Sequence, residues 1–132
     1  MRFLLDTHAF IWWASEPHKL SEHALELLQR PEHHFFLSLA SVWEMQIKAQ
    51  LGKLTLPPLA DLITAQTEQN GIELLPIRLE HILGPSALEP HRKDPFDRLL
   101  VVQARAETLT LLSRDPIFDD YDVAVQWQHG AV

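Results

Sequence analysis

Four acidic residues stand at positions where a carboxylate could take part in chemistry: Asp6, Glu44, Asp97 and Asp115. Asp6 follows the apolar run 2–5, and Asp115 follows a second apolar run, 109–112. In open α/β sheets, ligands bind outside the carboxyl ends of the strands, so both positions suit a binding site. The simpler interpretations are that Asp6 caps the helix after it and that Asp115 begins a turn with Pro116.

Glu44 falls on a helix face that is otherwise apolar. The spacing predicts a helix over residues 40–51 with an apolar stripe that contains Glu44 and consists of Ala40, Trp43, Ile47 and Leu51. A buried carboxylate is costly unless it is paired or bound to a metal ion, which favours a functional role. The alternative is a surface ion pair between Glu44 and Lys48, four residues further along the helix.

Asp97 shares a helix face with apolar residues at the next positions of the same stripe: Leu100, Val101 and Ala104. Asp94 and Asp97 could also serve as the N-cap and first-turn acid of this helix. We assign the cap to Asp94, with Pro95 as the first helical residue. For Asp97 both roles stay open, because an acid in the first turn can favour the helix and still point into a site.

Together the four acids are expected to converge on one edge of a parallel sheet. Carboxylates gathered there repel one another unless cations lie between them. Oxygen ligands without cysteine or histidine select hard cations, so we expect Mg²⁺ or Mn²⁺. Such a centre supports hydrolysis of phosphodiester bonds, in which one ion activates water and a second stabilises the leaving oxygen.

Short apolar runs alternate with amphipathic segments, which predicts the elements that position these acids. We expect strands at 2–5, 34–39, 72–75, 109–112 and 123–127, and helices that begin at Thr7 or span 21–30, 40–51, 59–70, 79–88 and 95–107. The strands lack a two-residue alternation, so helices should cover both faces of a mainly parallel five-stranded sheet. We expect a single α/β domain over residues 1–132.

The composition excludes several classes of protein. The chain has 132 residues, of which 46% are hydrophobic, and a formal net charge of −7. That charge disfavours a protein that coats nucleic acid, but not an enzyme that reaches nucleic acid through metal ions. The absence of cysteine excludes disulfide scaffolds, cysteine-ligated zinc and thiol nucleophiles. Because Asp6 and His8 interrupt the apolar start and no run suits a membrane span, we expect a cytoplasmic protein without a membrane partner.

The chain resembles the PIN-domain ribonucleases, and among them the VapC-type toxins of bacterial type II toxin–antitoxin pairs. Four motifs carry the resemblance, in order and over nearly the whole chain: Phe3-Leu4-Leu5-Asp6-Thr7-His8, Ser41-Val42-Trp43-Glu44-Met45, Asp94-Pro95-Phe96-Asp97-Arg98-Leu99-Leu100 and Leu112-Ser113-Arg114-Asp115. The resemblance implies metal ligation by Asp6, Glu44 and Asp97, with Asp115 as a fourth acid. It places the hydroxyls of Thr7 and Ser113 near the metal or its water.

The resemblance also implies an activity and partners. The implied activity is that of an RNA endonuclease dependent on Mg²⁺ or Mn²⁺. The implied partners are a second copy of the chain, since such enzymes are often homodimers, and a small cognate antitoxin that inhibits the enzyme. The alternatives are a PIN-type nuclease that processes RNA or DNA without a toxin role, and a non-catalytic binding module.

A basic group that could contact substrate phosphate consists of His91, Arg92, Lys93 and Arg98. A solvated loop is the alternative for that group. Lys93 departs from the family pattern and leaves open whether Asp94 or Asp97 is the ligand. The helix face favours Asp97.

Overall fold

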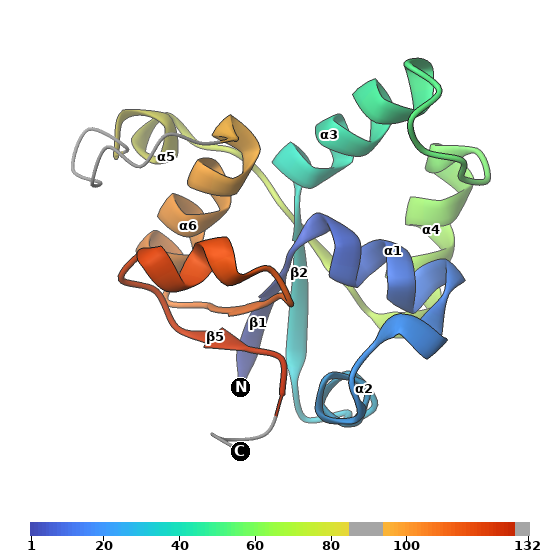
Figure 1. Cartoon of the computed structure of the whole chain (residues 1–132), viewed down its shortest axis with the longest axis horizontal. Coiled ribbons are helices and arrows are strands. Elements are labelled where there is room, and N and C mark those ends of the chain that lie inside the picture. Colours follow the sequence, from blue (N-terminus) through green and yellow to red (C-terminus); the bar gives the residue numbers. More distant parts are fainter. Residues whose placement is uncertain (85–93, 129–132) are drawn as a thin grey trace.

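A computed structural model describes residues 1–84 and 94–128 of the chain. Within these residues a five-stranded sheet has the order β3-β2-β1-β4-β5, and every neighbouring pair of strands is parallel. The strands are β1 (Arg2–Leu5), β2 (His34–Ser38), β3 (Glu73–Leu75), β4 (Thr110–Leu112) and β5 (Val125–Gln126). Figure 1 shows β1 and β2 side by side near the centre of the molecule. The predicted α/β class is confirmed.

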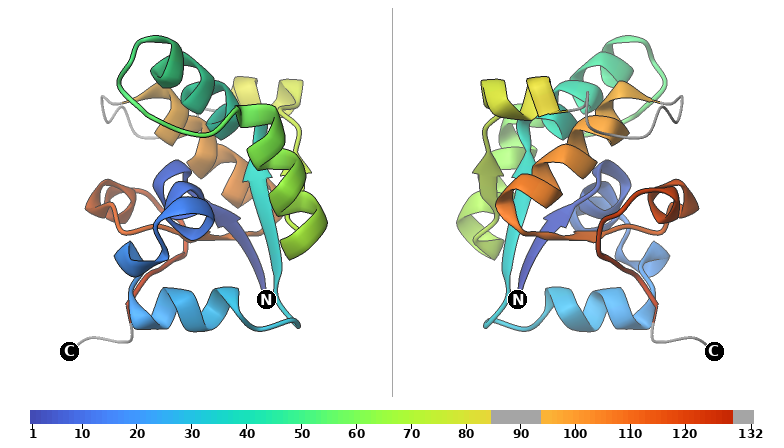
Figure 2. Two further views of the ribbon diagram at one scale, coloured as in Figure 1. Left: turned by 90° about the vertical axis from the view of Figure 1, so that its right-hand side faces the viewer. Right: turned by 90° about the vertical axis from the view of Figure 1, so that its left-hand side faces the viewer.

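Helices cover both faces of the sheet, as the views in Figure 2 show. On one face, Phe3 and Leu5 pack in a core cluster with residues of α1 (Thr7–Ser15), α2 (Glu22–Leu28) and α4 (Leu59–Asn70). On the other face, Leu4 and Leu111 pack with residues of α6 (Pro95–Glu107) and the 3₁₀ helix η3 (Pro116–Asp120). Successive side chains of a strand point to opposite faces, so the three residues of β1 after Arg2 are all apolar and are buried on both faces.

The other helices are α3 (Leu39–Gln50), α5 (Leu79–Leu83) and a short 3₁₀ helix, η1 (Pro17–Lys19). Several helices begin or end at the capping residues that the sequence predicted. Ser21 caps α2 by accepting the amide of Ala24, and α4 ends at Gly71, whose φ of 64° is left-handed. The predicted helix 79–88 is confirmed only as far as Leu83, because Gly84 is its C-cap, and residues 85–88 lie outside the described residues.

The predicted apolar stripe of α3 is wrong in part. Trp43 is 62% exposed and Leu51 is 63% exposed, whereas Glu44 is only 5% exposed. The buried face of α3 is instead formed by Ala40, Ser41, Glu44 and Met45. The helix is rotated in this way because Met45, and not Trp43, enters the core cluster. Trp43 lies over Phe96 of α6, with ring centroids 5.6 Å apart, and lines an apolar groove between α3 and α4.

The strand order creates a crevice at one edge of the sheet. The first three strands lie side by side in chain order, from β1 through β2 to β3. The last two, β4 and β5, lie on the other side of β1. In such sheets the ligand crevice lies outside the carboxyl ends of the two strands at the reversal, here β1 and β4. Asp6 and Ser113 are the residues that follow these two strands. None of the helices in the described part of the chain is long and apolar enough to cross a membrane.

Candidate metal centre at the carboxyl edge of the sheet

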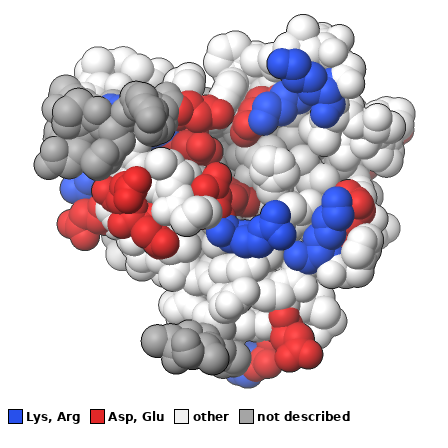
Figure 3. Space-filling model, viewed as in Figure 1, with Lys and Arg blue, Asp and Glu red and all other residues white. Residues whose placement is uncertain are grey.

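An acidic cavity of about 130 Å³ lies at this edge. It is lined by the four predicted acids and four further residues, namely Asp6, Thr7, His8, Glu44, Lys48, Asp94, Asp97 and Asp115. Figure 3 shows acidic side chains gathered around the hollow of this face, with basic side chains beside them. The predicted convergence of Asp6, Glu44, Asp97 and Asp115 on one place is therefore what the structure shows.

Asp6 both caps a helix and faces the cavity. It follows β1, and its Oδ1 accepts the backbone amide of Ala9 at 2.7 Å, which caps α1. Its Oδ2 accepts the hydroxyl of Ser113 at 2.5 Å, so residues after β1 and β4 are joined directly. Burial raises the pKa of Asp6, although the hydrogen bonds from Ser113 and Ala9 oppose this by favouring the carboxylate.

Glu44 combines the two interpretations that the sequence left open. It is buried, and its Oε1 accepts the hydroxyl of Thr7 at 2.7 Å. Its Oε2 accepts the ammonium of Lys48 at 2.7 Å, which forms the predicted pair within α3. The same hydrogen bond raises the pKa of Lys48, because it favours the charged ammonium. Two side chains, Thr7 and Lys48, thus hold Glu44 in place, and Thr7 Oγ1 in turn lies 3.0 Å from Ser41 Oγ.

Asp97 also has a raised pKa. It is half-buried in the first turn of α6, and its pKa is raised from 3.8 to about 7. Burial is the largest cause, followed by the negative charges of Asp94, Glu44, Asp115 and Asp6. Asp94 is the N-cap, as expected, with its Oδ1 accepting the amide of Phe96 at 2.8 Å. The four acids around Asp97 therefore make a region where one more negative charge is unfavourable and a cation is favoured.

Asp115 is the exposed member of the group. Its Oδ1 accepts the amide of Ile117 at 3.0 Å and caps η3, so the predicted turn is confirmed. Its own amide donates to Ser113 Oγ at 3.0 Å. Ser113 thus contacts both Asp6 and Asp115, and it fixes the spacing of two acids that follow different strands.

The donor set fits a hard divalent cation in its chemistry. All the predicted ligand atoms are carboxylate oxygens, and a cavity of about 130 Å³ has room for an ion with water, at roughly 30 Å³ per water molecule. Within residues 1–84 and 94–128, however, no group of three His, Asp or Glu side chains is arranged to hold a metal ion. Asp6 and Glu44 are instead satisfied by donors of the chain itself. Metal ligation by these residues stays a prediction.

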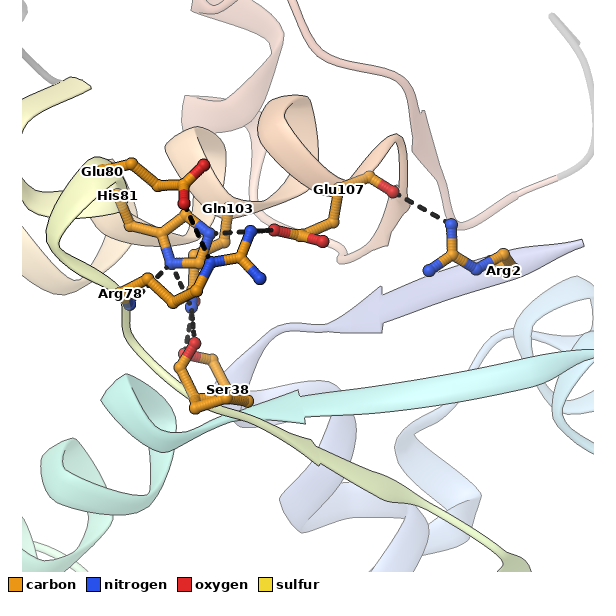
Figure 4. A network of polar contacts seen from close by, with 8 residues as sticks. Arg2, Ser38, Arg78, Glu80, His81, Gln103 and Glu107 are labelled. Atoms are coloured by element: carbon orange, nitrogen blue, oxygen red, sulfur yellow. Dashed lines mark hydrogen bonds and ion pairs between the residues drawn. The ribbon is translucent and has the colours of Figure 1, made fainter.

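A buried polar network joins the two helices that carry Glu44 and Asp97, and Figure 4 shows it from close by. Ser38 caps α3 through the amide of Ala40 and donates to Oε1 of Gln103, on α6, at 2.5 Å. Fully buried His81 accepts the amide of Arg78 at Nδ1, so its Nε2 carries the proton and donates to Glu107. The network fixes α6 against α3 and α5, and so fixes the distance between Glu44 and Asp97.

Two further sets of residues bear on the site: the predicted basic group, and residues that line the cavity but were not predicted. His91, Arg92 and Lys93 lie outside the described residues, and Arg98 is half-buried in the first turn of α6. Three residues that line the cavity were not predicted as part of it: His8, Lys48 and Asp94. Lys48 and Asp94 could have been found, because the pairing and capping assigned to them place them beside Glu44 and Asp97.

Comparison with known protein families assigns the chain to one of them. A family model described as the PIN domain matches residues 3–124. The chain belongs to the PIN domain family. This match confirms the family that the four sequence motifs indicated, and its range includes all four acids of the cavity. A search of curated protein sequences found no match.

Solved structures share the fold of this PIN domain at low sequence identity. A chain of VapBC2 from Rickettsia felis, bound to a DNA fragment from their promoter, is 15% identical, with a TM-score of 0.72 over 97% of this chain and 100% of that chain. DNA-bound VapBC from Salmonella typhimurium is 15% identical, with a TM-score of 0.67 over 96% of this chain and 97% of that chain. VapBC-1 from nontypeable Haemophilus influenzae is 18% identical, with a TM-score of 0.64 and the same coverage of both chains.

Proposed function

We propose that this PIN domain is a metal-dependent endoribonuclease that hydrolyses RNA phosphodiester bonds and acts as the toxin of a toxin–antitoxin pair. The observation that carries the proposal is the gathering of Asp6, Glu44, Asp97 and Asp115 around one cavity, where burial and the neighbouring negative charges raise the pKa of Asp97 to about 7. Perturbed acids in a cavity are a mark of catalytic sites. The RNA substrate implies a cytoplasmic location.

The four carboxylates would hold Mg²⁺ or Mn²⁺, the cations that oxygen ligands select. Bound divalent ions supply an activated water and stabilise the leaving oxygen in phosphodiester hydrolysis. The chain's own residues prepare the ligands. Thr7 and Lys48 orient the two oxygens of Glu44, and Ser113 holds Asp6 at a fixed distance from Asp115.

The toxin role is supported by the shared fold and by the resemblance of the motifs to VapC-type toxins. The three structures described above are of VapBC, each similar to this chain over nearly its whole length. A cognate antitoxin and a homodimer are therefore the partners we propose. The exposed apolar side chains of α3, such as Trp43, suit contact with another protein surface.

Cleavage of RNA tests the enzymatic part of this proposal. Purified protein, free of any antitoxin, should cut total RNA with Mg²⁺ or Mn²⁺ and should stop when EDTA is added. Asp97→Asn should abolish cutting, whereas Asp122→Asn, an exposed acid in the loop before β5, should leave it unchanged. Wild-type protein that cuts no RNA with either metal would refute the enzyme and favour a binding module.

The toxin role needs a separate test, because a processing nuclease would share the same chemistry. Expression of the wild-type chain should arrest growth, and expression of Asp97→Asn should not. A short reading frame beside the gene should encode a small protein that binds this chain and relieves the arrest. Normal growth on expression, together with active cleavage in vitro, would favour a role in RNA or DNA processing.

A further inference from the structure

A second cleft opens beside the acidic cavity and shares three of its residues. This cleft, about 340 Å³ in volume, is lined by Asp6, His8, Trp12, Arg114, Asp115 and Pro116. Asp6, His8 and Asp115 line both hollows, so the two form one continuous depression at the carboxyl edge of the sheet. A strand of nucleic acid whose reacting phosphate reached the acids would therefore have neighbouring nucleotides at this cleft.

Arg114 gives the cleft a fixed positive charge. Its side chain is exposed, and its guanidinium carbon lies 4.6 Å from the centre of the Trp12 ring, within the range of a cation–π contact. Trp12 is itself held in the core, 8% exposed and packed against Trp127 with ring centroids 5.9 Å apart. Arg114 is thus an exposed cation on a rigid support, and less freedom is lost when it binds a ligand.

His8 adds a second polar group to the same wall. It lies one helical turn before Trp12 on α1, and the two ring centroids are 5.7 Å apart. The imidazole and the guanidinium both contact the ring of Trp12, so nitrogen donors gather in one small area. An arginine fork matches the oxygens of a phosphate and can bind two of them at once.

The positive charge of Arg114 also offsets the repulsion between the acidic cavity and a negatively charged strand. Four carboxylates repel a polyanion, and Arg114 is adjacent in sequence to one of them, Asp115. Lys48, on the opposite side, is already engaged by Glu44 at 2.7 Å. The guanidinium of Arg114, by contrast, is supported by an aromatic ring and can make all of its charged hydrogen bonds to a ligand.

We infer that the cleft between His8 and Arg114 is a subsite for single-stranded RNA, in which Arg114 binds a backbone phosphate next to the one that reacts. The inference rests on the proposed function and deepens it by naming a residue that binds the substrate. It assigns to Arg114 a part in binding the strand, while the four acids act on the reacting phosphate.

Binding of RNA, measured without cleavage, tests the subsite. The probe is a fluorescent single-stranded RNA of mixed sequence, and the readout is anisotropy with Mg²⁺ in the Asp97→Asn background. Arg114→Ala should raise the Kd about tenfold at moderate salt. It should also reduce the slope of log K against log salt by about 0.7, the value for one phosphate contact on a single strand.

Matched variants separate this effect from a general loss of charge. Arg30→Ala removes one exposed positive charge just before β2, at the opposite edge of the sheet, and should leave Kd and slope unchanged. Arg114→Lys keeps the charge and should restore the slope but only part of the affinity. An equal Kd and slope for Arg114→Ala and the parent would overturn the inference, as would an equal loss in Arg30→Ala.

Cleavage kinetics distinguish a failure of this inference from a failure of the proposed function. In the wild-type background, Arg114→Ala should raise KM about tenfold with little change in kcat. If RNA is cut and the KM of Arg114→Ala is unchanged, the subsite is refuted while the nuclease stands. If no RNA is cut, yet binding depends on Arg114 as described, the nuclease is refuted while the subsite stands.

Discussion

The raised pKa of Asp97 predicts an unusual dependence of stability on pH. An aspartate of the unfolded chain has its pKa near 3.8, and that of folded Asp97 lies near 7. Below pH 3.8 the group is protonated in both states and costs nothing. Between pH 3.8 and 7 folding must take up a proton, so the metal-free protein loses stability as pH rises, and above pH 7 the full cost remains.

The size of this cost follows from the same difference in pKa. A change from 3.8 to about 7 corresponds to about 4 kcal/mol at 1.36 kcal/mol for each pKa unit. Asp97 is only half-buried, so solvent screening reduces the expected cost to about 1–2 kcal/mol. Asp97→Asn removes the ionisable group with little change of shape and should recover that amount at pH 8.

Urea denaturation in EDTA measures the effect. The free energy of unfolding of Asp97→Asn should exceed that of wild type by about 1–2 kcal/mol at pH 8, and the difference should nearly vanish at pH 4. Asp122→Asn changes an exposed acid that does not line the cavity, so it is the matched control and should show no such trend. A constant difference between pH 4 and pH 8, or a loss of stability at pH 8, would refute the electrostatic argument.

Three further predictions follow from the contacts of the site. Ser38→Ala removes the cap of α3 and the partner of Gln103, so it should lower the free energy of unfolding by about 2 kcal/mol in urea; a value near zero would contradict the network. Ser113→Ala removes a hydrogen bond that lowers the pKa of Asp6, so the acid limb of the cleavage profile should move to higher pH, and an unmoved limb would count against this contact. Mg²⁺ should raise the melting temperature more at pH 8 than at pH 5.5, because protons compete for Asp97; equal increases would argue against binding there.

The sequence predicted the positions of the acids well, because strand ends are easy to recognise in this chain. Asp6 follows a short run of apolar residues that is buried on both faces, and the helix after it begins at once. The α4 and α6 helices were predicted to the residue, since Gly71 and Asp94-Pro95 are strong end signals. Parallel strands bring their carboxyl ends together, so the positions of Asp6 and Asp115 after strands predicted that these two acids meet, whereas Glu44 and Asp97 were placed from the faces of their helices.

The orientation of α3 could not be predicted in the same way. An apolar pattern of period 3.6 does not say which of two adjacent stripes faces the core, and Trp43 was placed inside although it is largely exposed. Glu44 was predicted as buried for a partly wrong reason. Its burial depends on Thr7, more than thirty residues away, whose hydroxyl replaces the water that a carboxylate needs. Tertiary hydrogen bonds of this kind leave no periodic signal in the sequence.

Direct binding of Mn²⁺ tests the central claim that the four acids form a site for divalent cations. Titration of the protein with Mn²⁺ at pH 7.5, followed through the electron paramagnetic resonance signal of the free ion, should show uptake by wild type. Asp97→Asn and Asp6→Asn should each bind at least tenfold more weakly, and Asp122→Asn should bind as wild type does. No uptake by the wild-type protein, or undiminished uptake by Asp97→Asn and Asp6→Asn, would contradict the assignment of the cavity as a metal centre.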